Sequence, residues 1–465
     1  MYFVGIDFGH GETTVSRVPG YNGAPVSQIA IKPSNNNEGK KIVSAVCRRN
    51  NQWSLVYGKQ DYKLEDIREG FKGRISEMTT RDKESMREFA KLIFATILKN
   101  DTDLEYNSPD DKNFELGIAC PSDWVRQDPN AQQEYLDFFR KECGVPVDFC
   151  MIENDAKYYS RCERFNGDES VLVIDIGASV IDFSTYVKSR CVSQCCWGTN
   201  LGTHMIQDAL MPHIYGFAKN MENVARLKQF KANNGLIGDV DATISSLVCS
   251  AIEEFYIEER DTFKLRIDYD DLTCAWTGYP WDSCIVYEVS KDEFNRIIAN
   301  YMQSIHETLQ NARIKLNTNG ITPNRILLLG GAIGMPFIQE YAKQIFGVTV
   351  DVEPMPEFSI SNGIALYMCR TDHLLEKFLV ELKTGLIGIT ILNIDYQKID
   401  MAIGHALRKS LAYHIDSSSI DSKRNVNISS HLFLSNKDVN SILEDRIMRY
   451  AINVFREHMY FEVKY

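Results

Sequence analysis

The spacing of apolar and polar residues predicts two similar strand–turn–strand units, one at the start of the chain and one near its middle. Val171–Ile174 is a short apolar, β-branched run of the kind that forms buried strands, and Ile181–Val187 continues in strand-forming residues after a tight turn. Tyr2–Asp7 and Thr13–Val18 repeat this arrangement near the N-terminus. We therefore expect a β-hairpin at the start of each half of the chain.

Further strands and helices follow each of these hairpins. In Thr80–Lys99, apolar residues recur at intervals of three and four, which gives a helix one apolar face. Ser290 and Glu293 form a capping box at the start of another helix. The other expected helices are Pro129–Gly144 with Asp128 as its cap, Glu153–Phe165, Asp241–Arg260, Lys291–Leu316 and Met335–Phe346; the other expected strands are Val26–Ile31, Lys41–Arg48, Trp53–Tyr57, Phe114–Cys120 and Arg325–Leu329. The alternation predicts an α/β fold.

Three turns carry residues that packing does not explain. Asp7 and Asp175 each end an apolar strand and are followed by a glycine turn, and a third glycine turn begins at Gly330 after an apolar strand. A carboxylate at the end of a buried strand is costly unless it is solvated, paired or holding a metal. Glycine lets a phosphate group approach the backbone closely. These turns are therefore candidates for a phosphate or metal site.

Taken together, the order and spacing of the turns resemble the superfamily of actin, sugar kinases and heat-shock ATPases. The chain looks most like the ATPase domain of the seventy-kilodalton, DnaK-type heat-shock chaperones. The matching segments are Asp7-Phe8-Gly9 for the first phosphate loop, Asp175-Ile176-Gly177 with Asp182 for the second, Gly330-Gly331-Ala332 for the adenosine loop, Phe71-Lys72-Gly73-Arg74 for the segment with the catalytic lysine, and Ile152–Ala156 for the "INEPTAAA" segment.

This resemblance covers about residues 1–370 and implies an actin-like ATPase fold. Two duplicated ribonuclease-H-like lobes, residues 1–165 and 166–375, would enclose a nucleotide cleft. A final helix containing Gly363 and Ala365 would return to the first lobe. Residues 376–465 are too few and too mixed in pattern for the chaperones' peptide-binding domain. We expect them to form a small C-terminal α/β appendage, which is a candidate surface for a protein partner or client.

The resemblance also assigns roles within a site for ATP or ADP with magnesium. Asp7, Asp175 and Asp182 would hold the magnesium ion, mainly through its water molecules. Lys72, Glu153 and Asp175 would be catalytic, the lysine by neutralising charge on the γ-phosphate and the acids by orienting the attacking water. The residues expected to contact the nucleotide are Gly9, His10, Gly11, Gly177, Ala178, Ser179, Gly202, Glu253, Tyr256, Gly330, Gly331 and Ala332.

Several of these residues have ordinary structural explanations that remain open. Lys72 is alternatively a surface lysine in a turn, and Glu153 a helix N-terminal glutamate stabilised by the helix dipole. Tyr256, which stands where the chaperones have a lysine, is either a residue that stacks on the base or a core-packing tyrosine.

The two phosphate loops also depart from the chaperone pattern. His10 and Gly11 stand where a hydroxyl residue is usual, and Ala178-Ser179-Val180 replaces Gly-Gly-Thr. Two hydroxyl groups expected near the γ-phosphate are therefore missing, although Thr13, Thr14 or Ser179 could compensate. We expect nucleotide binding together with slow hydrolysis.

Composition and charge exclude several other classes of function. The net charge of −12 over 465 residues argues against a nucleic-acid-binding surface. No apolar run of ~20 residues predicts a membrane span, and the N-terminal segment lacks the pattern of a signal peptide. The twelve cysteines lack zinc-type spacing and often lie in apolar runs, which favours buried thiols in a reducing compartment. We expect a cytoplasmic protein.

Two hypotheses from different classes follow. The first is a chaperone-like ATP-binding protein, a slow magnesium-dependent ATPase whose lobe closure acts as a conformational switch. The alternative is an actin-like nucleotide-binding scaffold or filament protein with weak or no hydrolysis. A sugar kinase is a third hypothesis, but no sugar-binding insertion with a catalytic acid is evident in the sequence.

Overall fold

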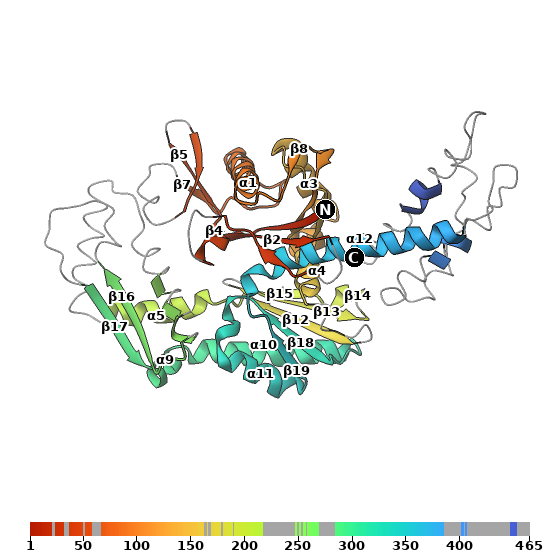
Figure 1. Cartoon of the computed structure of the whole chain (residues 1–465). Coiled ribbons are helices and arrows are strands. Elements are labelled where there is room, and N and C mark those ends of the chain that lie inside the picture. Colours follow the sequence, from red (N-terminus) through yellow and green to blue (C-terminus); the bar gives the residue numbers. More distant parts are fainter. Residues whose placement is uncertain are drawn as a thin grey trace, which may run out of the picture.

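The computed structural model describes most of the first 385 residues. The described residues are 1–20, 24–31, 37–49, 52–57, 67–161, 165, 169–177, 180–188, 190–216, 247–248, 251–252, 254–256, 258–268, 284–385, 401–403, 405–406 and 447–452. Most of the predicted appendage 376–465 and half of the predicted helix Asp241–Arg260 lie outside these residues. Two mixed β-sheets with helices around them form the body of the described chain, which is an α/β protein (Figure 1).

The first sheet is built around the predicted N-terminal hairpin. Its strands are β1 (Tyr2–Phe8), β2 (Glu12–Pro19), β3 (Ser27–Gln28), β4 (Lys41–Val43), β10 (Phe114–Cys120) and β11 (Phe149–Ile152). Their order is β11-β10-β1-β2-β3, and β4 also pairs with β2. Strand β1 runs antiparallel to β2 and parallel to β10, and β10 runs parallel to β11.

The second sheet is built around the hairpin in the middle of the chain. Its strands are β12 (Ser170–Ile176), β13 (Ile181–Val187), β14 (Arg190–Cys191), β15 (Trp197–Thr199), β18 (Arg325–Leu329) and β19 (Thr349–Val352). Their order is β14-β13-β12-β18-β19, and β15 also pairs with β13. Strand β12 runs antiparallel to β13 and parallel to β18, which runs parallel to β19.

The two sheets therefore share one plan. Each has an antiparallel hairpin, a short strand beyond its second arm, and two parallel strands on the other side. Strands β1 and β12 also have the same sequence of buried and half-buried positions. Asp7 and Asp175 occupy the same half-buried position near the end of these strands. The hairpin register pairs Asp7 with Thr14 and Asp175 with Asp182.

The remaining elements cover the sheets or extend from them. The helices are α1 (Thr80–Asn100), α2 (Ser122–Gln127), α3 (Ala131–Asp137), which continues as a π-helical turn (Phe138–Glu142), α4 (Glu153–Tyr159), α5 (His204–Gly216), α9 (Lys291–Ile297), α10 (Ala299–Thr318), α11 (Pro336–Phe346) and α12 (Ser359–Gly385). The further strands are β5 (Ala45–Arg49), β6 (Gln52–Leu55), β7 (Ile67–Glu69), β8 (Tyr106–Ser108), β9 (Asp111–Lys112), β16 (Thr262–Asp268) and β17 (Cys284–Ser290). Short 3₁₀ turns cover Asn37–Lys40, Ser193–Cys195, Gly331–Gly334 and Pro356–Phe358.

Several predicted elements differ in their bounds from those observed. Helix α3 begins at Ala131, because Asp128 forms a turn instead of a cap, accepting a hydrogen bond from the backbone N–H of Asn130 at 2.9 Å. The helix that begins at Glu153 ends at Tyr159, and the predicted helix Lys291–Leu316 is divided at Ile298. The predicted cap is present, since Ser290 Oγ accepts a hydrogen bond from the N–H of Glu293 at 3.3 Å.

Helix α12 connects the second sheet to the first. It follows β19 in sequence, and its first half packs against β1, β2, β10 and α4 (Figure 1). Its approach to α4 is very close, because a Cβ atom at Gly363 would lie 1.8 Å from the carbonyl oxygen of Ala156. Short helix α4 is thereby held between the two sheets.

Two further predictions concern membranes and thiols. No helix in the described part of the chain is long and apolar enough to cross a membrane. None of the eight cysteines whose side chains are described forms a disulfide, and seven of them are buried. The thiols therefore behave as small core residues in these ranges.

Candidate functional site

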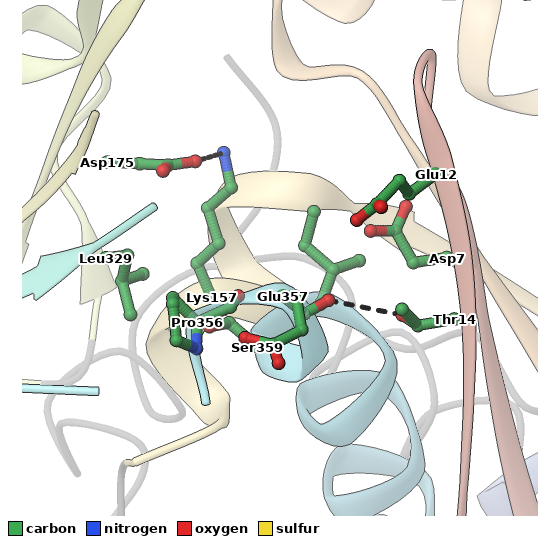
Figure 2. Close-up of a pocket in the computed structure, with 10 residues that line it drawn as sticks. Asp7, Glu12, Thr14, Lys157, Asp175, Leu329, Pro356, Glu357 and Ser359 are labelled. Carbon is green, nitrogen blue, oxygen red and sulfur yellow. Dashed lines mark hydrogen bonds and ion pairs between the residues drawn. The ribbon is translucent and has the colours of Figure 1, made fainter. Parts of the chain in front are cut away.

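The three predicted turns meet at a cavity of about 200 Å³ (Figure 2). It is lined by Asp7, Glu12, Thr14, Lys157, Asp175, Leu329, Pro356, Glu357, Ser359 and Ile360. Figure 2 shows Asp7 and Glu12 on one side, Asp175 on the other, and Lys157 between them. Whole ligand pockets typically measure about 300–1,000 Å³. The cavity is therefore large enough for part of a nucleotide, such as its phosphates.

The carboxylates of the second hairpin are held by Lys157, which comes from α4. Lys157 Nζ lies 2.6 Å from Asp175 Oδ2 and 3.9 Å from Asp182 Oδ2, and only 6% of the lysine side chain is exposed. Burial alone lowers the pKa of Lys157, but the neighbouring carboxylates of Asp175 and Asp182 hold it above its ordinary value. The lysine is therefore a permanent buried cation.

Asp7, on the first hairpin, has an incomplete set of partners. Its Oδ1 atom is buried and accepts no hydrogen bond within the described structure. Burial raises the pKa of Asp7 to about 7, against the opposing effect of Lys72 and with a further increase from Glu153. An unsatisfied buried carboxyl oxygen at the wall of a cavity is typical of a group that awaits a ligand.

Lys72 and Glu153, which the resemblance predicts to be catalytic, form an ion pair. Lys72 Nζ lies 2.9 Å from Glu153 Oε1, and 7% and 17% of the two side chains are exposed. Burial lowers the pKa of Lys72, but Glu153 and Asp7 outweigh it and keep the pKa above its ordinary value. Lys72 is thus a buried cation beside Asp7, which sets aside its interpretation as a surface lysine.

The first and second of the predicted turns are held by hydrogen bonds to their backbone carbonyl or N–H groups. In the first, the Ser44 hydroxyl donates to the Gly9 carbonyl at 2.7 Å, and the Ser44 N–H donates to the Gly11 carbonyl at 2.8 Å. In the second, the N–H of Gly177 donates to the Val180 carbonyl at 2.9 Å. Ala178 and Ser179 lie outside the described residues. His10, between the two glycines of the first turn, is exposed.

Part of the chain is similar to heat shock protein 70. Over 105 residues, 23% of this chain, it is 26% identical to the mitochondrial-type heat shock protein 70 of Encephalitozoon cuniculi (strain GB-M1). Over 79 residues, 17% of this chain, it is 25% identical to the mitochondrial-type heat shock protein 70 of Encephalitozoon hellem. These alignments span 17% and 13% of the two relatives. No protein-family model matches the chain.

The third turn, which the heat shock protein 70 resemblance assigns to adenosine, lies directly beside the second. Gly330 has φ +90°, and a Cβ atom there would lie 2.3 Å from the Ile176 carbonyl oxygen and 2.5 Å from Asp175 Oδ1. Only glycine fits this position without strain. Gly331 faces open space, and Ala332 is buried. Close contact with Asp175 therefore places the third turn at the same end of the sheet as the second.

The other heat shock protein 70-like positions differ in how directly they join the site. Gly202 precedes α5 in a loop that is tied to the second turn, because the N–H of Thr203 donates to the Gly177 carbonyl at 3.1 Å. Tyr256 packs against Phe255 and Phe294 in the core of the second half, which favours its structural interpretation. Glu253 lies outside the described residues.

Two of the three hydroxyl groups that could replace the missing ones already have partners within the protein, while the third, that of Ser179, lies outside the described residues. Thr13 Oγ1 lies 3.0 Å from Ser44 Oγ, and Thr14 Oγ1 lies 3.1 Å from Ser361 Oγ. Both threonines are almost fully buried. Each hydroxyl thus has a protein partner, although Thr14 also lines the cavity.

The donor set for magnesium is weaker than the resemblance to heat shock protein 70 implies. The described residues contain no cluster of three or more acids, histidines or cysteines that could hold a metal ion. Of the three predicted carboxylates, Asp175 forms an ion pair with Lys157 and Asp182 lies next to it.

Lys157 is a site residue that the sequence analysis does not predict. Its position four residues after Glu153, on the same face of a helix, was the available signal.

Proposed function

We propose that this protein is a chaperone-like ATP-binding protein with an actin-like fold. The observation that carries the proposal is the meeting of two equivalent hairpins at one cavity. Asp7 and Asp175 end matching strands of two sheets with the same strand order, and both line that cavity. The partial similarity to heat shock protein 70 supports this assignment.

In this proposal the cavity takes the phosphate groups of the nucleotide. The turn at Gly9–Gly11 supplies backbone N–H groups, which favour anions where several point in one direction. The adenosine lies along Gly330–Ala332, next to Asp175. Asp7, with its unsatisfied buried oxygen, contacts the nucleotide or the water around it.

We further propose that hydrolysis is slow and that the bound nucleotide acts mainly through conformation. Lys72 is the group available to neutralise charge on a transferring phosphate, and Glu153 positions it at 2.9 Å. The hydroxyl groups of Thr13 and Thr14 are already hydrogen-bonded within the protein. Closure of the two sheets on the nucleotide would then be the signal passed to a protein partner.

Calorimetric titration of ATP and ADP tests this function directly. We expect Asp7→Asn and Asp182→Asn each to change nucleotide affinity by about tenfold, since Asp7 lines the proposed phosphate site and Asp182 lies 3.9 Å from Lys157, which lines it too. Asp292→Asn, in the exposed first turn of α9, is the matched control and should leave the affinity unchanged. Nucleotide affinities that are the same in all three variants and in the wild type would refute the assignment. Phosphate release on the same samples measures turnover.

A further inference from the structure

Lys157 lies where two of the three predicted metal ligands converge. Its ammonium group contacts Asp175 at 2.6 Å and lies 3.9 Å from Asp182, so one cation serves both carboxylates. Figure 2 shows the side chain extending from α4 across the cavity wall to Asp175. The cation reaches the second hairpin from a helix that is continuous in sequence with strand β11 of the first sheet.

A magnesium ion does not fit the Asp175–Asp182 pair while Lys157 is present. Magnesium requires octahedral coordination at close range and a shell of water that it gives up reluctantly. One of the two carboxylate oxygens of Asp175, Oδ2, is already paired with an ammonium group. A second cation placed between the two carboxylates would also meet the positive charge of Lys157 at short range, where repulsion is strong.

Contacts of helix α4 with its neighbours fix the position of Lys157. The residue before it, Ala156, is in contact with Gly363 of α12, so the helix backbone cannot move in that direction. On either side, Asp155 Oδ1 accepts a hydrogen bond from Tyr186 OH at 2.7 Å, and Arg161 forms a bidentate ion pair with Glu353. With α4 fixed at three points, the ammonium group is held close to the two carboxylates.

Two neighbouring acids have other lysines as partners. Glu12 pairs with Lys41 at 3.2 Å, and Glu153 pairs with Lys72 at 2.9 Å. Among the ten residues described as lining the cavity, Lys157 is the one with a positively charged side chain. A phosphate group that enters this cavity therefore meets the ammonium group of Lys157 in the cavity wall.

We propose that the ammonium group of Lys157 takes the place of the divalent metal in this site, so that ATP and ADP bind without magnesium. The proposal rests on the proposed nucleotide-binding function and specifies its ionic requirement. The lysine balances Asp175 and Asp182 in the free protein and turns one of its N–H groups to the phosphates when nucleotide is bound.

Calorimetric titration of ATP into the wild-type protein, with magnesium and then with a chelator, tests the ionic requirement. We expect affinities that differ by less than about threefold between the two conditions. Lys157→Met should bind ATP about tenfold or more weakly in chelator and recover when magnesium is added, because its two carboxylates are free for the metal. Lys157→Arg keeps the charge and should remain independent of magnesium. Lys112→Met removes a comparable lysine from its pair with Asp148 and should behave as the wild type.

Manganese binding in the absence of nucleotide separates this proposal from the proposed function. Paramagnetic resonance should show that Mn²⁺ binds to Lys157→Met but not to the wild type, and that Lys157→Met combined with Asp182→Asn loses this binding. A wild-type affinity for ATP that falls about tenfold or more in chelator would overturn the proposal. Tight Mn²⁺ binding to the wild type would overturn it too. Absence of ATP binding in every sample would refute the nucleotide function, while the Mn²⁺ results would still decide the role of Lys157.

Discussion

Asp155, on the side of α4 that faces the second sheet, gives the fold a specific dependence on pH. Its carboxyl group is buried, and Tyr186 OH donates a hydrogen bond to it at 2.7 Å. Burial raises the pKa of Asp155 from 3.8 to about 6, although the bond from Tyr186 lowers it. The folded protein therefore keeps a proton that the unfolded chain has already lost. This stabilising contribution is complete below about pH 4 and is lost as the pH rises through about 6.

Replacing Asp155 with asparagine should remove this dependence. The amide is neutral at every pH and can still accept the hydrogen bond from Tyr186. Between about pH 4 and pH 7.5, the free energy of unfolding of the wild type should fall relative to Asp155→Asn by up to about 3 kcal/mol. Urea denaturation at both pH values measures this difference.

Asp137 provides a control of opposite sign for this experiment. Its carboxyl group is exposed, and the hydrogen bond from Lys141 lowers its pKa. The stabilisation from Asp137 is therefore present above its unfolded pKa and is lost as the pH falls. Asp137→Asn should thus lower the free energy of unfolding least at acidic pH. A difference between wild type and Asp155→Asn that does not change with pH would contradict the buried-carboxyl argument.

At this scale the sequence reveals the candidate acids better than their partners. Asp7 and Asp175 stand out because each ends an apolar strand, where a charge is unexpected. Lys157 does not stand out, because a lysine within a helix usually lies on a solvated face. Its contact with Asp175 depends on the placement of α4 against β12, which no local pattern specifies.

Among the elements, α4 and α12 cross at a contact that only glycine permits. A Cβ atom at Gly363 would lie 1.8 Å from the Ala156 carbonyl oxygen, and the obstacle is backbone that belongs to a packed helix. Alanine is intrinsically better than glycine in a helix by about 1 kcal/mol. A clash this close with a backbone atom that cannot turn aside outweighs that gain.

Gly363→Ala should therefore destabilise the protein strongly. We expect a loss of about 3 kcal/mol or more in the free energy of unfolding, because α12 or α4 must move to accept the methyl group. Gly334→Ala is the control, since a Cβ atom there meets nothing within 4 Å, and it should change stability by less than about 0.5 kcal/mol. Thermal unfolding of both variants checks the comparison. A Gly363→Ala protein as stable as the wild type would show that this contact is looser than described.

The bounds of the helices and strands show which features local periodicity can predict. The hairpin strands and α1 were predicted closely, since their apolar positions follow a single period. The break between α9 and α10 was missed, because Phe294, Ile298, Tyr301 and Ile305 are all buried and keep helical spacing across it. Helix α4 ended earlier than predicted, and nothing in its apolar pattern marks Tyr159 as the end.

At the scale of the whole molecule, the fold depends on pairings between distant segments. Strand β1 pairs with β10, which joins Tyr2 to Phe114, and β12 pairs with β18, which joins Val171 to Arg325. The hairpins can be predicted because their strands are adjacent in sequence. The parallel pairings, and hence the cavity between the sheets, were expected only because the motifs resemble a known family. Most residues beyond 385 lie outside the described part of the chain, so the expected C-terminal appendage stays a prediction.

An ion pair at the end of α4 joins the two halves of the described chain. Arg161 follows α4, and its guanidinium group binds both oxygens of Glu353, which follows β19 of the second sheet. Only 2% of the Glu353 side chain is exposed. Removing the arginine would leave a buried carboxylate without its main partner, a change that typically costs about 3–5 kcal/mol.

Arg161→Met should therefore loosen the contact between the halves as well as lower stability. Hydrogen exchange should accelerate in α4 and in β19, next to the broken pair, while α1, on the far side of the first sheet, should keep its protection. Glu353→Gln in the same chain removes the unpaired charge and should restore most of the lost stability. Arg296→Met, which breaks an exposed pair with Glu293, should change neither property. If exchange increased equally in all three elements, Arg161 would stabilise the fold generally and would not act as a link between its halves.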